Sequence, residues 1–169
     1  MSIRIDKNII FDIYKKSCEL YDILCKITKT RRFCVKLTIN GGHSQGDPYV
    51  IRHGDRYYLY ATGSDGVQLY TARDKTHWQY EGICFARAGE KEYWAPAVLF
   101  YEGRFWLYYS SMGEGETDTH RQHMCVAVSD RPDGGFVFAG ELIPPFSIDA
   151  HVVLSGGELY MFYSTNDYE

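Results

Sequence analysis

Two aspartates hold the same place in repeated segments of this sequence. Asp47 opens the segment DPYVIRHGDRYYLYATG, and Asp149 opens the segment DAHVVLSGGELYMFYST. A third segment, APAVLFYEGRFWLYYSS, aligns with both without a gap and begins at Ala95. Carboxyl groups take or give protons and change the pKa of their neighbours, so a pair brought together is equipped for acid–base chemistry. The repeat therefore makes Asp47 and Asp149 the first candidates for a functional site.

The elements that must position these aspartates are β-strands. Each segment has an apolar strand, a tight polar or glycine turn and an aromatic second strand, the pattern of a β-hairpin. A second hairpin is indicated after the first copy at residues 67–82, and after the second copy at residues 124–140. The copies start about 50 residues apart, a spacing typical of the four-stranded blades of propellers. Stacked blades cover both faces of each sheet, which explains aromatic strands without clean polar alternation.

The sequence thus predicts an all-β chain that forms part of a β-propeller, with a short helix before it. Residues 41–169 hold two complete four-strand units and the first hairpin of a third, about two and a half blades. Closed propellers use about 4 to 8 blades. The expectation is a propeller domain truncated at its C-terminal side, which could associate with itself through open blade edges.

Residues 1–40 form a separate N-terminal extension by their texture. Apolar residues recur at helical spacing between Ile10 and Cys25, and strict alternation between Phe33 and Ile39 predicts a strand. We expect that strand to complete the last blade of the ring. Trp78 occupies the place of Phe136 in the next unit, which predicts that Trp78 belongs to the core.

Composition excludes several classes of function. The net charge is −4 and the basic residues are dispersed, which argues against nucleic-acid binding. The five cysteines are odd in number and form no CxxC pair, which favours a reduced compartment. No apolar run approaches the ~18 residues of a membrane span, and charges interrupt what would be a signal-peptide core. A cytoplasmic location follows if Met1 is the true start; a different start would allow secretion.

The motifs DPYVIRHGDRYYLYAT, DKTHW, YWAPAVLFYEGRFWLYYSS, VAVSDRPDGGF and IDAHVVLSGGELYMFYS follow one another in that order. In this order the chain resembles glycoside hydrolase family 43. The resemblance implies a five-bladed propeller that hydrolyses arabinose- or xylose-containing glycans, such as arabinan, arabinoxylan or xylo-oligosaccharides, with inversion at the anomeric carbon.

The same resemblance implies the roles of the acidic residues. The general base matches Asp47 and the acidic pKa modulator matches Asp149, whereas the general acid, a glutamate on the fourth blade, has no match in this chain. We therefore expect the isolated chain to be inactive. The plain structural alternative for Asp47 is a turn-capping aspartate before Pro48. A second reading of the whole chain is a non-catalytic carbohydrate-binding or decayed propeller fragment that associates through its open edges.

Four further residues are candidates for substrate binding. Tyr93 and Trp94 could offer ring faces to a sugar, or could pack between blades. His151 shares a strand face with Asp149 and could bond a sugar hydroxyl, help to hold an ion or belong to the core. His43 could reach the rim of the pocket, although a solvated loop histidine is the default.

No cofactor is required by these motifs, and no metal ligand is assigned. The resemblance allows a calcium ion in the central channel without committing any residue to it. The acidic and histidine-rich insertion at residues 114–123 has no ligand spacing that identifies a metal.

Overall fold

The computed structural model describes residues 38–43 and 46–166. The helix expected between residues 10 and 25 and most of the strand expected at residues 33–39 lie outside these ranges. The described part of the chain is built from strands with one short 3₁₀ turn. The elements are β1 (Thr38–Asn40), β2 (Tyr49–His53), β3 (Arg56–Ala61), β4 (Val67–Ala72), β5 (His77–Phe85), β6 (Glu90–Tyr101), β7 (Arg104–Gly113), η1 (Thr119–Arg121), β8 (His123–Ser129), β9 (Val137–Ile143), β10 (Ser147–Ser155) and β11 (Glu158–Thr165).

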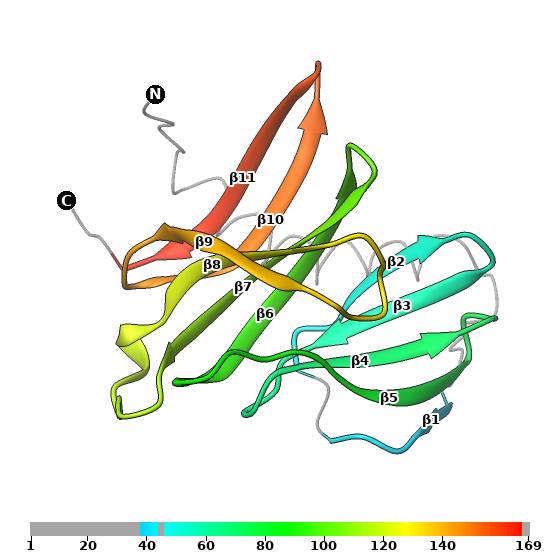
Figure 1. The fold of residues 1–169 in the computed structure, drawn as a ribbon, viewed down its shortest axis with the longest axis horizontal. Coiled ribbons are helices and arrows are strands. Elements are labelled where there is room, and N and C mark those ends of the chain that lie inside the picture. The colour runs from blue at the N-terminus through cyan, green and yellow to red at the C-terminus, as the bar shows by residue number, and fades with distance from the viewer. Residues whose placement is uncertain (1–37, 44–45, 167–169) are drawn as a thin grey trace, which may run out of the picture. The chain divides into compact units, whose positions relative to one another are not determined.

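The predicted hairpins assemble into blades in the predicted order. Strands β2 to β5 form an antiparallel meander, and β6 to β9 form a second one with the same order (Figure 1). Strands β10 and β11 form the hairpin that opens a third unit. The fold is therefore a fragment of a β-propeller, as the repeat predicts.

The end of the N-terminal strand corrects one expectation. Thr38–Asn40 does not lie in a later blade; it pairs in parallel with β5, at the outer edge of the first sheet. The segment thus adds a fifth strand to the first unit. The physical reason is local, because β5 would otherwise present an unpaired edge there.

The core is layered between the blades. One cluster joins the first and second sheets and includes Tyr60 and Phe85 from one with Tyr109 and Cys125 from the other. A second cluster joins the second sheet to the third hairpin, and a third covers the opposite face of the first sheet. Each complete sheet therefore buries apolar residues on both faces.

Trp78, predicted to be core, is buried, and so is Phe136, which holds the same place in the next unit. Trp78 is 4% exposed and Phe136 is 8% exposed. The third hairpin differs, because apolar side chains of β10 and β11 remain open to solvent. These are Leu154, Leu159, Tyr160 and Phe162. Among the described residues, no helix has the length and apolar character needed to cross a membrane.

Candidate active site

The first residue of each repeat has the same unusual backbone conformation. Asp47, Ala95 and Asp149 have positive φ values of 48°, 43° and 60°. The strand register shifts around Ala95 in β6 and around Asp149 in β10. A left-handed conformation at a non-glycine residue is uncommon and is kept only where the surroundings enforce it. The alignment made from sequence therefore identifies positions that are equivalent in structure.

The carboxylate of Asp47 is held by a threonine that the sequence did not single out. Thr62 Oγ1 donates a hydrogen bond to Asp47 Oδ2 at 2.8 Å and accepts one from the backbone N–H of Ala95 at 3.1 Å. The N–H of Thr62 also donates to the carbonyl of Gly46 at 3.0 Å. Because the hydroxyl accepts from Ala95, its own proton is directed at Asp47. One side chain thus links the aspartate to the next blade.

Asp149 lies close enough to Asp47 to experience its charge. The residue remains solvent-accessible, yet the surrounding protein desolvates its carboxyl and raises its pKa. A hydrogen bond from the side chain of Ser164 opposes this rise, and the charge of Asp47 adds to it. The structure therefore brings the two aspartates into one electrostatic environment, although they are 102 positions apart in the sequence. We call Asp47 and Asp149 the aspartate pair.

Ring contacts confirm that the strands carrying the pair approach each other. Tyr49 and His151 each stand two residues after an aspartate, and their ring centroids are 6.3 Å apart with an interplanar angle of 55°. His151 is exposed, so it is available to a ligand and is not a core histidine.

Trp94 and Tyr93, which are neighbours in sequence, have different surroundings. Trp94 is partly buried, and its indole N–H donates to Glu92 Oε2 at 3.1 Å, which fixes the ring. Tyr93 is completely buried and its hydroxyl bonds the backbone of Arg87. Its ring stacks on Tyr109 at 5.7 Å. The expectation that Tyr93 could stack on a sugar is therefore wrong, because both ring faces lie in the packing between blades.

His43 lies over the outer strands of the first sheet. Its backbone N–H donates to Gln68 Oε1 at 3.3 Å, and its ring meets the edge of Tyr80 at 6.3 Å. Both partners belong to β4 and β5, whereas Asp47 precedes β2. Gln68 also donates to the carbonyl of Thr62 at 2.6 Å, so hydrogen bonds link the backbone of His43, through Gln68, to the threonine that holds Asp47.

The acidic and histidine residues of the insertion at residues 114–123 lie in two different places in the structure. Asp118 caps η1 by accepting from the N–H of His120, and its carboxylate also meets the ring of His120 at 2.8 Å. His123 instead begins β8 and is largely buried. The described residues provide no set of three acidic, histidine or cysteine ligands at the aspartate pair. Calcium takes 6 to 8 oxygen ligands, so these residues alone do not form a calcium site.

His123 belongs to a buried polar group that sequence reasoning missed. Its Nε2 lies 3.9 Å from Glu90 Oε1, which also receives Arg87 Nη1 at 2.7 Å, and Ser111 donates to Glu90 Oε2 at 3.1 Å. Interactions with Cys125 and then with Glu90 raise the pKa of His123 to about 10. Burial opposes the ionisation of Glu90, but His123, Ser111 and Arg87 outweigh this effect and lower the pKa of Glu90. We call Glu90, His123 and Cys125 the Glu90 cluster.

Comparison with known proteins gives a consistent family assignment. Residues 41–169 match the family model described as glycosyl hydrolases family 43. An extracellular exo-α-(1→5)-L-arabinofuranosidase of Cellvibrio japonicus is 31% identical over 80 residues, which cover 41% of this chain and 23% of that protein. A xylan 1,3-β-xylosidase of a Vibrio species is 30% identical over 78 residues, covering 39% of this chain and 15% of that protein.

A solved structure supports the same assignment. A thermostable family-43 glycoside hydrolase superimposes with a TM-score of 0.59 at 29% identity. The matched region covers 70% of this chain and 41% of that protein. The chain therefore matches less than half of this solved relative, and a smaller share of the curated ones.

Proposed function

Because the chain belongs to glycosyl hydrolase family 43, we propose that it carries the base side of a glycosidase site for arabinose- or xylose-containing glycans. The observation that supports this proposal most directly is the aspartate pair. Two carboxylates occupy equivalent left-handed positions at the first strands of two units, and the charge of Asp47 contributes to the raised pKa of Asp149. Family membership indicates that the reaction of this site is glycoside hydrolysis.

Asp47 is the general base in this proposal. Inverting hydrolysis requires a carboxylate that removes a proton from water as the water oxygen bonds to the anomeric carbon. The bond from that carbon to the leaving oxygen breaks on the opposite side of the sugar. Thr62 holds one oxygen of Asp47, which leaves the other oxygen to receive the proton. Thr62 is thus a positioning residue.

Asp149 acts through its charge. Its raised pKa results from desolvation and from the neighbouring Asp47, so it responds to the charge of the groups around it. In the proposed mechanism it modulates the acid that protonates the leaving oxygen. That acid matches no residue of this chain, so we propose that hydrolysis needs residues beyond the ones that the chain supplies.

The proposed class of sugar is supported by the names of the curated relatives and by one aromatic side chain, Trp94. The two curated relatives are named for arabinofuranosidase and xylosidase activities, both on pentose glycans. Trp94, oriented by Glu92, offers a ring beside the equivalent position Ala95. Sugar faces rich in C–H groups stack on such rings. His151, exposed near Tyr49, is the second proposed sugar contact.

The test has a catalytic arm and a binding arm. We expect the chain alone to give no turnover of aryl α-L-arabinofuranosides or aryl β-D-xylosides. Calorimetry with arabino- and xylo-oligosaccharides should detect binding that Trp94→Ala weakens and that Tyr93→Phe leaves unchanged. Turnover that survives Asp47→Asn would contradict the base assignment. Absence of binding to either oligosaccharide series would contradict the proposed site.

The open face of the third hairpin favours a second candidate function. Tyr160 and Phe162 lie on the same face of a two-stranded sheet and are 37% and 42% exposed. A non-catalytic fragment could cover this face by self-association with a second copy. Light scattering should then report a dimer that Tyr160→Gln with Phe162→Gln converts to a monomer. A monomeric chain that binds oligosaccharide would favour the first proposal.

A further inference from the structure

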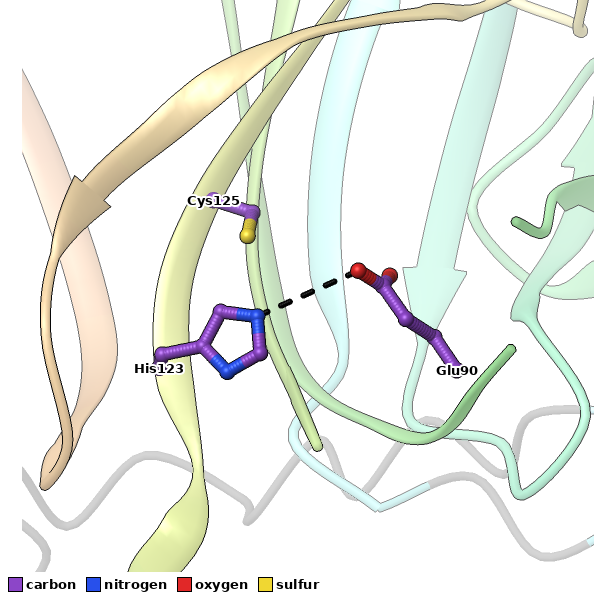
Figure 2. A group of neighbouring side chains, drawn as sticks. All are labelled: Glu90, His123 and Cys125. Atoms are coloured by element: carbon purple, nitrogen blue, oxygen red, sulfur yellow. Dashed lines mark ion pairs between the residues drawn. The ribbon is translucent and has the colours of Figure 1, made fainter. Parts of the chain in front are cut away.

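Away from the aspartate pair, the Glu90 cluster gathers three different metal-binding groups. Carboxylate, imidazole and thiol atoms from Glu90, His123 and Cys125 all lie within 4.8 Å of one another. Figure 2 shows the carboxylate and the ring pointing toward each other, with the sulfur of Cys125 beside the ring. Glu90 begins β6, whereas His123 and Cys125 lie two residues apart on β8. Strand alternation therefore puts the histidine and the cysteine on one face.

The donor set selects one class of cation. Zinc accepts oxygen at about 2.0–2.2 Å, nitrogen at about 2.0–2.1 Å and sulfur at about 2.3 Å, in a tetrahedral arrangement. Atoms bound in this way are roughly 3.3 to 3.7 Å apart. Glu90 and His123 are already at 3.9 Å, so a small side-chain rotation would complete the approach. Calcium and magnesium prefer oxygen ligands throughout and would not select this group.

An unsatisfied atom at the same place independently points to a missing group. Tyr109 is fully buried, and its hydroxyl adjoins the thiol of Cys125 but has no oxygen or nitrogen partner among the described residues. It pairs with Cys125 in the strand register, and Ser111 pairs with His123. A buried hydroxyl without a partner is rare and calls for a water or an ion nearby. We propose that Glu90, His123 and Cys125 form a binding site for a zinc-like divalent cation.

Two native features compete with the cation: the proton that His123 carries at neutral pH, which must leave before the ring binds a metal, and the guanidinium of Arg87. Arg87 Nη1 meets Glu90 Oε1 at 2.7 Å, and its positive charge opposes a second cation there. The side chain of Arg87 is 42% exposed, so it can turn away to solvent when Glu90 takes a metal. The competition with Arg87 distinguishes a metal site from a structural ion pair. Removing the guanidinium should strengthen metal binding, whereas it would only weaken a purely structural ion pair.

The experiment uses the full chain after chelation, titrated with Co²⁺ and with Zn²⁺. Cobalt bound through a thiolate gives a sulfur-to-metal charge-transfer band, and equilibrium dialysis counts the zinc. We expect one equivalent that is lost in Cys125→Ser and in His123→Gln. The control Cys84→Ser should retain it, because Cys84 donates to the carbonyl of Val67 and lies outside the cluster. The three remaining cysteines are present in every variant, so the difference isolates Cys125.

Arg87→Gln completes the test, with an expected gain of about tenfold in zinc affinity. Thermal unfolding of each variant establishes that it is folded, and His123→Gln serves if Cys125→Ser does not fold. Zinc content that is the same in the wild type, Cys125→Ser and His123→Gln would overturn the proposal. A wild type that binds neither ion, with Arg87→Gln equally unable, would overturn it as well.

Discussion

Carboxylates occur in two contrasting settings in this protein. Glu90 is 8% exposed at its side chain and is surrounded by donors from Arg87 and Ser111 and by the ring of His123. Asp47 and Asp149 are exposed and face each other's charge. Removing one partner of a buried ion pair leaves an uncompensated charge and strongly destabilises the fold, whereas exposed acids near each other cost a little stability. The difference indicates which acids are free to meet a substrate.

The three equivalent positions refine this comparison. Ala95 adopts the same left-handed conformation as the two aspartates but carries no acid. The conformation is therefore a property of the repeat and is not by itself a sign of catalysis. What distinguishes Asp47 and Asp149 is the carboxylate that this backbone presents.

The largest expected effect is on the buried acid. Glu90→Ala should lower the free energy of unfolding by about 2–4 kcal/mol, because it leaves His123 and Arg87 without their partner. The matched change at the exposed pair, Asp47→Asn, should cost less than about 1 kcal/mol. Urea unfolding of both variants measures the contrast. Equal losses would erase the distinction between the two settings.

A smaller effect is expected at Thr62. Thr62→Val keeps the shape of the side chain but removes the hydroxyl, so the N–H of Ala95 loses its acceptor. We expect a loss of about 1–2 kcal/mol in the free energy of unfolding, and weaker oligosaccharide binding by calorimetry. Thr62→Ser retains the hydroxyl and should restore most of both quantities. A serine variant as impaired as valine would place the effect in packing.

Removing the charge of Asp149, which is desolvated and lies near Asp47, should have a weaker effect and should stabilise the protein. The folded-state pKa of Asp149 is raised, so its ionised form costs stability at any pH well above that pKa. Asp149→Asn should raise the free energy of unfolding at neutral pH by about 0.5 kcal/mol, since the residue is exposed and screened. This advantage should disappear as the pH falls through the raised pKa. Measuring the free energy of unfolding of the wild type and Asp149→Asn at several pH values checks the sign of the difference. A stability advantage of Asp149→Asn that grows as the pH falls would contradict the prediction.

The smallest expected effect concerns the backbone shared by the repeats. Ala95→Gly relieves a left-handed alanine but increases the freedom of the unfolded chain, so the two terms nearly cancel. We expect a change of no more than about 0.5 kcal/mol in the free energy of unfolding. Asp47→Gly should cost more, because it also removes the bond with Thr62. Thermal unfolding of the pair compares them directly.

The sequence was sufficient to predict the features that depend on local pattern. Hairpin periodicity gave the strands, and the ungapped repeat gave the equivalence of Asp47, Ala95 and Asp149. The roles of the two aspartates, the cytoplasmic location and the N-terminal helix remain predictions. Trp78 was correctly assigned to the core from its place in the repeat.

The missed features depend on contacts between strands. Thr62 meets Asp47 across a hairpin and Ala95 across two sheets. Glu90 and Cys125 come together only when β6, β7 and β8 are in register. Tyr93 was misassigned for the same reason. Its position next to Trp94 in the sequence did not indicate that the Tyr93 ring would be buried and the Trp94 ring only partly buried.

The hydroxyl of Thr62 bonds both the carboxylate of Asp47 and the amide of Ala95 in the next sheet. The orientation of that carboxylate therefore depends on the angle between the two sheets. A ligand or substitution that tilts the second sheet against the first would move the amide of Ala95 and turn the carboxylate with it. Packing far from the sugar could in this way adjust reactivity without touching either aspartate. Variants of the apolar layer between these sheets are accordingly a means to tune the chemistry from a distance.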